Sequence, residues 1–155
     1  AVAVLQGPGG RREVPVRDFF LADGIANTRR EPHEIVTEVR IPRASSTRRC
    51  GYAKLRQRKS IDFPLLTVAV ALELEDDGTV RSLEGIVTGL GARPRALTGW
   101  EDLAVGEVPR DELLEELALR AHRQCHPLEN IIVDPEWRRA MVPVYVRRAL
   151  KAALA

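Results

Sequence analysis

The stretch LLTVAVALELEDDGTVRSLEGIVTGL, residues 65–90, decides the fold of this chain. Leu and Val dominate residues 65–75, and Asp76-Asp77-Gly78 is a strong hairpin signal before a returning strand at 79–90. Residues 51–58 alternate enough to form a strand ahead of this hairpin. The pattern predicts an antiparallel meander of about three strands, within a sheet of three to four strands.

The part of the chain after this sheet is predicted to be helical. Pro109-Arg110-Asp111 opens a helix with an acidic first turn, and Pro127 ends it. A second helix begins at Asp134-Pro135-Glu136 and runs to Leu154; a weaker one is expected at 95–103. The expected buried stripes contain Leu113, Leu114, Leu117, Ala118 and Ala121, and then Trp137, Met141, Val144, Tyr145 and Leu150. Strands followed by about three helices predict an α+β fold.

The first 45 residues are typical of the edge of a different domain. Ala1–Leu5 and Glu13–Val16 are predicted strands around a Gly-Pro-Gly-Gly turn, and Glu34–Ile41 alternates as a third strand. Such a hairpin is marginal by itself in water, so we expect the last strands of a larger sheet. A polar linker at 43–51 places the boundary near residue 45. The predicted domains are residues 1–45 and 46–155.

Composition and charge narrow the class of protein. Of the 155 residues, 45% are hydrophobic and 30% charged, which is typical of a globular chain. No apolar run approaches the roughly 20 residues that a membrane helix needs. Residues 1–60 carry 13 Lys/Arg against 6 Asp/Glu, whereas residues 61–155 carry 11 against 16. A basic first part favours a polyanionic partner, either nucleic acid or the phosphates of a nucleotide cofactor.

Six basic side chains gather within twelve residues: Arg48, Arg49, Lys54, Arg56, Arg58 and Lys59. This basic run fits a solvated edge strand or a surface that faces phosphates. Only Tyr52 and Phe63 lie near enough in sequence to stack on bases, which makes nucleic acid the weaker interpretation. An autonomous module that binds nucleic acid or another polyanion is the alternative function.

The cysteines and histidines offer a weak metal signal. His122-x-x-Cys125-His126 groups three potential ligands at a helix end, but only the remote His33 and Cys50 could complete a tetrahedral zinc site. A polar helix terminus is the favoured interpretation. The two cysteines favour free thiols in a reducing cytosol, with one long-range disulfide as the alternative. No dinucleotide fingerprint, nucleophile elbow or HExxH motif indicates a catalytic constellation.

Four motifs follow one another along the chain: Tyr52-Ala53-Lys54-Leu55-Arg56-Gln57-Arg58, Asp62-Phe63-Pro64-Leu65-Leu66, Gly89-Leu90-Gly91-Ala92-x-Pro94 and Asp134-Pro135-Glu136-Trp137-Arg138-Arg139. Their order and spacing resemble the FAD-binding medium subunit of the molybdenum hydroxylases, the family of xanthine dehydrogenase, carbon monoxide dehydrogenase and 4-hydroxybenzoyl-CoA reductase. Residues 10–42 are similar to the tail of that family's FAD-binding domain. The resemblance implies an α+β domain like the carbon monoxide dehydrogenase flavoprotein C-terminal domain, preceded by the last strands of an FAD-binding domain.

The resemblance also implies cofactors and partners. The family's pyrophosphate-binding glycine loops lie upstream of Ala1 and the chain lacks an initiator Met, so we expect the C-terminal portion of a flavoprotein subunit. FAD would bind in the complete subunit. The molybdenum cofactor and iron–sulfur clusters would lie in a large and a small partner subunit of a cytoplasmic hetero-oligomer. This portion would form part of the flavin pocket and a docking surface for electron transfer, without being catalytic alone.

Three residues match the flavin side of the family. Lys54 matches a lysine that reaches the flavin ring, where a cation stabilises the charge that develops on reduction. Asp62 matches an acidic residue in the adjacent loop. Phe63 matches a position where some relatives place Tyr, so the ring contact is kept and the hydroxyl is lost. The resemblance therefore implies cofactor binding by these three residues and no catalytic or metal-ligating residue.

Overall fold

A computed structural model describes residues 1–43, 46–129 and 133–155 of the chain. The chain divides into two compact units, residues 1–45 and 46–155. Ala44 and Ser45, where the predicted boundary lies, are outside the described residues.

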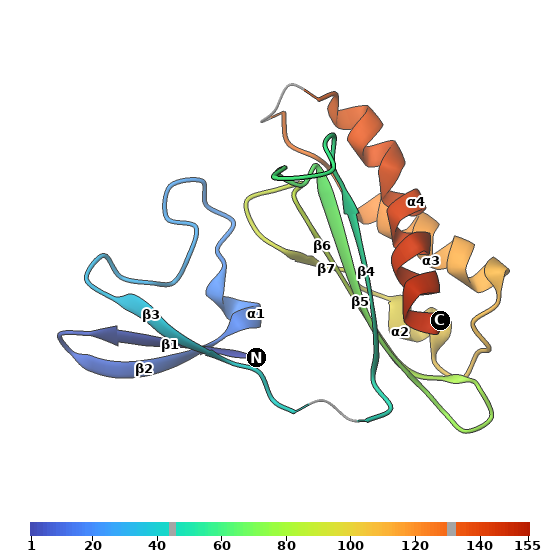
Figure 1. Cartoon of the computed structure of the whole chain (residues 1–155), viewed down its shortest axis with the longest axis horizontal. Helices are drawn as coiled ribbons and strands as arrows, with labels where there is room; N and C mark the ends of the chain where they lie inside the picture. Colours follow the sequence, from blue (N-terminus) through green and yellow to red (C-terminus); the bar gives the residue numbers. More distant parts are fainter. Residues whose placement is uncertain (44–45, 130–132) are drawn as a thin grey trace. The chain divides into compact units, whose positions relative to one another are not determined.

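The first unit is a three-stranded antiparallel sheet with the strand order β2-β1-β3 (Figure 1). Its elements are β1 (Val2–Gly7), β2 (Gly10–Pro15), the one-turn helix α1 (Val16–Phe19) and β3 (Ile35–Arg40). Gly7 pairs with Gly10 across the tight turn, and Gly10 has a φ of 107° that a side chain would resist. The small core consists of Ala3, Leu5, Val14 and Phe19. All of β3 is exposed, so this strand adds backbone pairing but no core.

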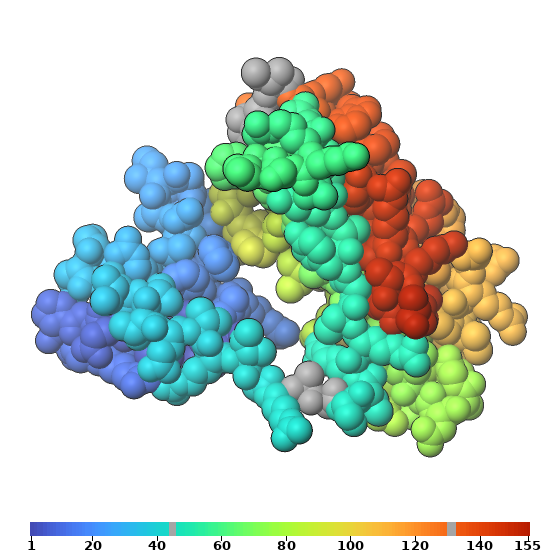
Figure 2. Space-filling view, in the orientation of Figure 1, coloured from blue at the N-terminus to red at the C-terminus, as the bar shows by residue number. Residues whose placement is uncertain are grey.

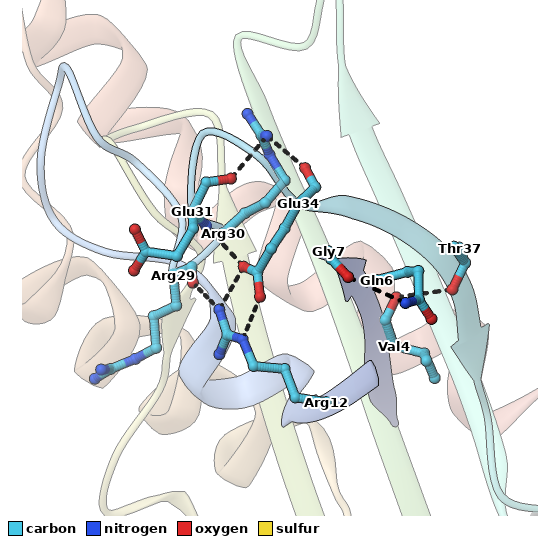
Figure 3. A network of polar contacts seen from close by, with 9 residues as sticks. All are labelled: Val4, Gln6, Gly7, Arg12, Arg29, Arg30, Glu31, Glu34 and Thr37. Atoms are coloured by element: carbon cyan, nitrogen blue, oxygen red, sulfur yellow. Dashed lines mark hydrogen bonds and ion pairs between the residues drawn. The ribbon is translucent and has the colours of Figure 1, made fainter. Parts of the chain in front are cut away.

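A buried carboxylate fastens the long loop before β3 to the hairpin (Figure 3). Glu34 is only 6% exposed. Its two oxygens accept from Nε and Nη2 of Arg12 at 2.6 and 2.7 Å, and the Glu31 N–H donates to it at 2.8 Å. Arg12 also donates to the Arg29 carbonyl at 2.6 Å, and Arg30 donates to the Glu34 carbonyl at 2.7 Å. The hydrogen bonds from Arg12 and then from Glu31 lower the pKa of Glu34 to about 2.

Acid should therefore loosen the first unit through Glu34. Its pKa in the folded chain lies below the ordinary 4.5, so its stabilising effect is complete above pH 4.5 and is lost as the pH falls toward about 2. We expect Glu34→Gln to lower the hydrogen-exchange protection of the β1 amides at neutral pH and to remove this acid dependence. Glu38→Gln, in exposed ion pairs with Arg11 and Arg40, is the control and should change little. An unchanged acid dependence in Glu34→Gln would contradict the assignment.

The second unit packs helices on one face of a four-stranded antiparallel sheet (Figure 1). Its strands are β4 (Arg49–Leu55), β5 (Leu66–Leu74), β6 (Val80–Thr88) and β7 (Arg95–Ala96), in that order across the sheet. Its helices are α2 (Trp100–Ala104), α3 (Asp111–Gln124) and α4 (Pro135–Leu154). The predicted α+β fold is confirmed. The helix predicted at 95–103 is wrong in its first half, because Arg95 and Ala96 pair with β6 and the helix begins only at Trp100.

The hairpin between β5 and β6 turns where the sequence predicts. Asp77 Oδ1 accepts from the N–H and the hydroxyl of Thr79 at 2.9 and 2.6 Å, and Gly78 has a φ of 86°. β6 ends one residue before Gly89, whose φ of 84° turns the chain away. β4 also ends earlier than predicted, at Leu55.

Helix α4 buries a different face from the predicted one. Of the predicted residues, Met141, Val144 and Tyr145 are only partly buried, and Trp137 is exposed, at 43%. Of the predicted stripe only Leu150 is buried, and the other buried residues of the helix are Arg138, Val142, Val146, Ala149 and Ala153. Gly51 on β4 accounts for the difference between the predicted and the observed buried face of α4, since a Cβ there would lie 1.9 Å from the Ala149 carbonyl oxygen. The helix approaches the strand at backbone contact, where only small residues fit.

A side chain at this crossing should weaken the second unit. Gly51→Ala forces the backbone of α4 away from β4, and overpacking of this kind costs about 1–3 kcal/mol of unfolding free energy, or more. Gly91→Ala is the matched control, because nothing lies within 4 Å of a Cβ there. Urea unfolding followed by tryptophan fluorescence measures both. Equal midpoints would mean that the crossing has no need of glycine.

Candidate functional site

The predicted site residues meet at the loop of residues 56–64, between β4 and β5. The Leu65 N–H donates to the Leu55 carbonyl at 2.9 Å, so the loop leaves and re-enters the sheet at one point. Figure 2 shows it as part of the green projection at one end of the second unit. Lys54 lies at the end of the preceding strand, and Asp62 and Phe63 lie near the end of the loop. The structure thus brings the three residues into one local unit.

The ammonium group of Lys54 is held in place by the loop. Lys54 lies on the face of β4 opposite the buried Ala53 and Leu55, and its Nζ donates to the Asp62 backbone carbonyl at 2.8 Å. An ammonium group has three N–H donors, so this bond orients the amine and still allows it to donate to a second group. Thr67 and Thr88 pair across the strands beside it, and their hydroxyls hydrogen-bond to each other.

The carboxylate of Asp62 points into its own loop. Its Oδ2 accepts from the backbone N–H groups of Arg58 and Gln57 at 2.8 and 2.7 Å, and its Oδ1 lies 3.6 Å from Arg58 Nη2. The hydrogen bond from the Arg58 N–H is the largest cause that lowers the pKa of Asp62, so the group is ionised at neutral pH. The side chain is 12% exposed.

Two large apolar side chains stand at the tip of the loop in water. Ile61 is 93% exposed and Phe63 is 91% exposed. Ile61 also has a φ of 45°, a left-handed conformation that a β-branched residue rarely adopts, and its carbonyl accepts from Arg58 Nη2 at 3.0 Å. Exposed apolar groups beside the basic Arg58 and Lys59 are typical of a surface that binds an apolar, anionic group.

Sequence reasoning missed Ile61 and Arg58 as parts of this site. Ile61 leads into an apolar run, and nothing in its residue type signals a left-handed backbone or an exposed side chain. The sequence shows Arg58 only as a basic residue of the run and of the first motif, because its contact with the Ile61 carbonyl exists only once the loop has closed.

A buried arginine on α4 holds the base of the loop. Arg138 is 1% exposed. Its Nε donates to the Leu65 carbonyl at 3.3 Å, its Nη1 to the Leu128 carbonyl at 3.1 Å and its Nη2 to the Gly89 carbonyl. Burial lowers the pKa of Arg138, yet an arginine keeps its charge in such a site. One side chain therefore ties the end of the loop, the end of β6 and the segment after α3 to the helix.

The basic run is divided between several structural roles. Arg48 pairs with Glu84 at 2.7 Å, and Arg49 donates to the Leu154 carbonyl at 3.1 Å. β4 is an edge strand of the sheet; Arg49 is its first residue and Arg48 immediately precedes it. The remaining basic side chains of the run, on Lys54, Arg56, Arg58 and Lys59, lie at the end of β4 and in the loop.

The cysteines and histidines form no site of their own in the structure. Across residues 1–43, 46–129 and 133–155, no group of three or more His, Cys, Asp or Glu side chains is arranged to hold a metal ion. Cys50 and Cys125 are both free thiols. Burial raises the pKa of the Cys125 thiol to about 11, so it stays protonated. Within the same described ranges, every helix is too short or too polar to cross a bilayer.

Comparison with known proteins gives the class of this α+β domain. Residues 51–153, which include the loop and nearly all of the sheet and of α4, match the family described as the CO dehydrogenase flavoprotein C-terminal domain. The chain belongs to this family. The predicted resemblance to the medium subunits of molybdenum hydroxylases is thereby confirmed.

Individual relatives extend the match to nearly the whole chain. The carbon monoxide dehydrogenase medium chain of Hydrogenophaga pseudoflava is 32% identical over 152 residues, which are 98% of this chain and 52% of that protein. The nicotinate dehydrogenase FAD-subunit of Eubacterium barkeri is 30% identical over 118 residues, 74% of this chain and 39% of that protein. A solved carbon monoxide dehydrogenase from Hydrogenophaga pseudoflava, lacking the Mo-pyranopterin moiety of its cofactor, superimposes with a TM-score of 0.87 at 29% identity. That superposition covers 99% of this chain and 52% of the other. The chain spans about half the length of the curated relatives it matches.

Replacing Arg138 should weaken the attachment of the loop. Arg138→Met leaves buried carbonyl oxygens without donors, and each such group costs about 1–3 kcal/mol. We expect a loss of more than about 2 kcal/mol in urea unfolding and faster exchange of the Leu65 amide. Arg138→Lys keeps the charge but not the fork of donors, and should fall between.

The matched control for Arg138 is Arg148→Met on the same helix. Arg148 is exposed and lies over the Tyr145 ring at 4.7 Å, an interaction worth about 1 kcal/mol at most on a surface. Equal losses for Arg138→Met and Arg148→Met would contradict the role of the buried guanidinium.

Proposed function

We propose that this chain is part of the FAD-binding subunit of a molybdenum hydroxylase-type oxidoreductase. The observation that carries the proposal is the 56–64 loop, a cationic segment with exposed apolar side chains on a domain of a flavoprotein family. Relatives named as a carbon monoxide dehydrogenase medium chain and a nicotinate dehydrogenase FAD-subunit support it. Residues 1–45 would be the C-terminal end of the FAD-binding domain, and residues 46–155 the flavoprotein C-terminal domain.

The residues of the loop fit a flavin. A flavin ring is flat and largely apolar, and its pyrimidine edge gains negative charge on reduction. Phe63 offers an exposed aromatic face for the ring, and as a Phe it offers contact without a hydrogen bond. Lys54 offers an oriented cation for the charged edge. Bound FAD would supply the electron-transfer chemistry, while these side chains bind and orient it.

The whole enzyme would contain two further subunits. Electrons would pass between iron–sulfur clusters in a small subunit and FAD, and a large subunit would bind the molybdenum cofactor. The remaining exposed surface of this chain would contribute to docking of these partners, in a cytoplasmic complex. The relatives named as medium chains support a hetero-oligomer of this kind. The 155 residues alone would provide a wall of the pocket and no catalysis.

The test of this function is Lys54→Met in the full-length subunit. Loss of a cation beside the reduced flavin should lower the FAD midpoint potential by about 30 mV or more, equivalent to about 1.4 kcal/mol for a two-electron couple. FAD should also be lost more readily during gel filtration. Lys151→Met, an exposed lysine paired with Asp111 on the helical side, is the matched control. An unchanged potential with unchanged FAD retention would refute the role of Lys54.

A further inference from the structure

Asp62 contributes two different groups to the loop, and they act in series. Its carboxylate binds the backbone N–H groups at the start of the loop, from Gln57 at 2.7 Å and Arg58 at 2.8 Å. Its backbone carbonyl, at the end of the loop, accepts from Lys54 Nζ at 2.8 Å. Closing the loop through the first group therefore sets where the second group can hold the amine.

The same carboxylate supports the unfavourable backbone of the tip. Ile61, which has a φ of 45°, lies between Arg58 and Asp62 in the chain, and Arg58 Nη2 donates to its carbonyl at 3.0 Å. Arg58 is held in turn by the Asp62 carboxylate, through its N–H and its guanidinium. Without this clasp, a β-branched residue would relax toward negative φ, and the exposed side chains on either side of Asp62 would turn with it.

The direction of the carboxylate argues against contact with a cofactor. Both oxygens face groups of the loop itself, and the side chain is 12% exposed, whereas Ile61 and Phe63 are more than nine-tenths exposed. An incoming ring would meet these apolar side chains and the Lys54 amine first. The resemblance implies that Asp62 binds the cofactor, whereas the hydrogen bonds direct its carboxylate to the backbone of its own loop.

We infer that Asp62 is a positioning residue, whose carboxylate closes the 56–64 loop so that Lys54 and the tip are presented to FAD. The inference rests on the proposed function for the identity of the ligand. The closing of the loop rests on the contacts of Asp62 alone.

Two substitutions separate positioning from a direct charge effect on the flavin. Asp62→Asn keeps an oxygen that can accept both N–H groups but loses the charge, and Asp62→Ala loses both. Positioning predicts that Asp62→Asn keeps the FAD midpoint potential of the full-length subunit near that of the wild type. It predicts that Asp62→Ala lowers the potential, in the same direction as Lys54→Met. A direct charge effect would instead raise the potential in both variants, because an anion near the flavin would be removed.

A second readout tests the loop without using the flavin. Arg58 and Lys59 are trypsin sites within the loop, and cleavage there requires the loop to open. In the full-length subunit we expect trypsin to cut Asp62→Ala in this loop roughly tenfold faster than the wild type, because the cleavage rate follows the population of the opened loop, which rises when the hydrogen bonds of the carboxylate are lost. We expect the cleavage rate of Asp62→Asn to stay within about twofold of the wild-type rate. Fragment masses identify the site.

The outcomes distinguish the two proposals. Cleavage of Asp62→Ala at the wild-type rate would overturn the positioning role, as would an equal rise of the midpoint potential in both Asp62 variants. If Lys54→Met leaves the flavin unchanged while Asp62→Ala still opens the loop, the assignment of FAD fails and the closing of the loop stands. Faster cleavage together with a lowered potential in Asp62→Ala alone supports both.

Discussion

The buried guanidinium of Arg138 joins α4 to three other segments of the second unit through their backbone carbonyl groups. Leu65, Gly89 and Leu128 come from three separate segments, and each gives a carbonyl to this one side chain. A charge is costly to bury unless its donors are satisfied, so these segments must stay in place for α4 to pack at all. Leu65 is also the residue that closes the 56–64 loop against Leu55. The stability of the domain and the shape of its candidate site therefore depend on the same interaction.

The loop is controlled at two levels. Arg138 holds its base from the helical side, and Asp62 holds its tip from within. This arrangement lets the domain display Ile61 and Phe63 in water, where they would otherwise collapse onto the sheet. A sheet covered by helices on one face thus carries the candidate site on a loop at its edge strand, and loops on a rigid scaffold are where proteins often carry functional residues.

The excess of basic residues in the first part of the chain lies in the segment that leads into the 56–64 loop. Residues 1–42 contain equal numbers of acidic and basic side chains, and the basic excess of the first 60 residues comes entirely from 43–59. In the first unit the charges pair with one another, as Arg12 does with Glu34 and Arg40 with Glu13. In the second unit Arg48 pairs with Glu84 and Arg49 donates to the Leu154 carbonyl, and the other basic side chains of residues 48–59 lie on Lys54 and the loop.

Local signals in the sequence determined much of this protein. The Asp76-Asp77-Gly78 turn, the helix starts at Asp111 and Pro135 and the α+β class follow from residue type and spacing, whereas the grouping of Lys54, Asp62 and Phe63 follows from the family resemblance. Only the tertiary structure decided which face α4 buries, where β4 ends and which way Asp62 points. Each of these depends on a partner far along the chain or on closure of the loop: Gly51 against Ala149, Leu55 against Leu65, and Asp62 against the N–H groups of Gln57 and Arg58. Periodicity reports which side chains are apolar, whereas the close approach of two backbones and the satisfaction of buried polar groups determine which of them are covered.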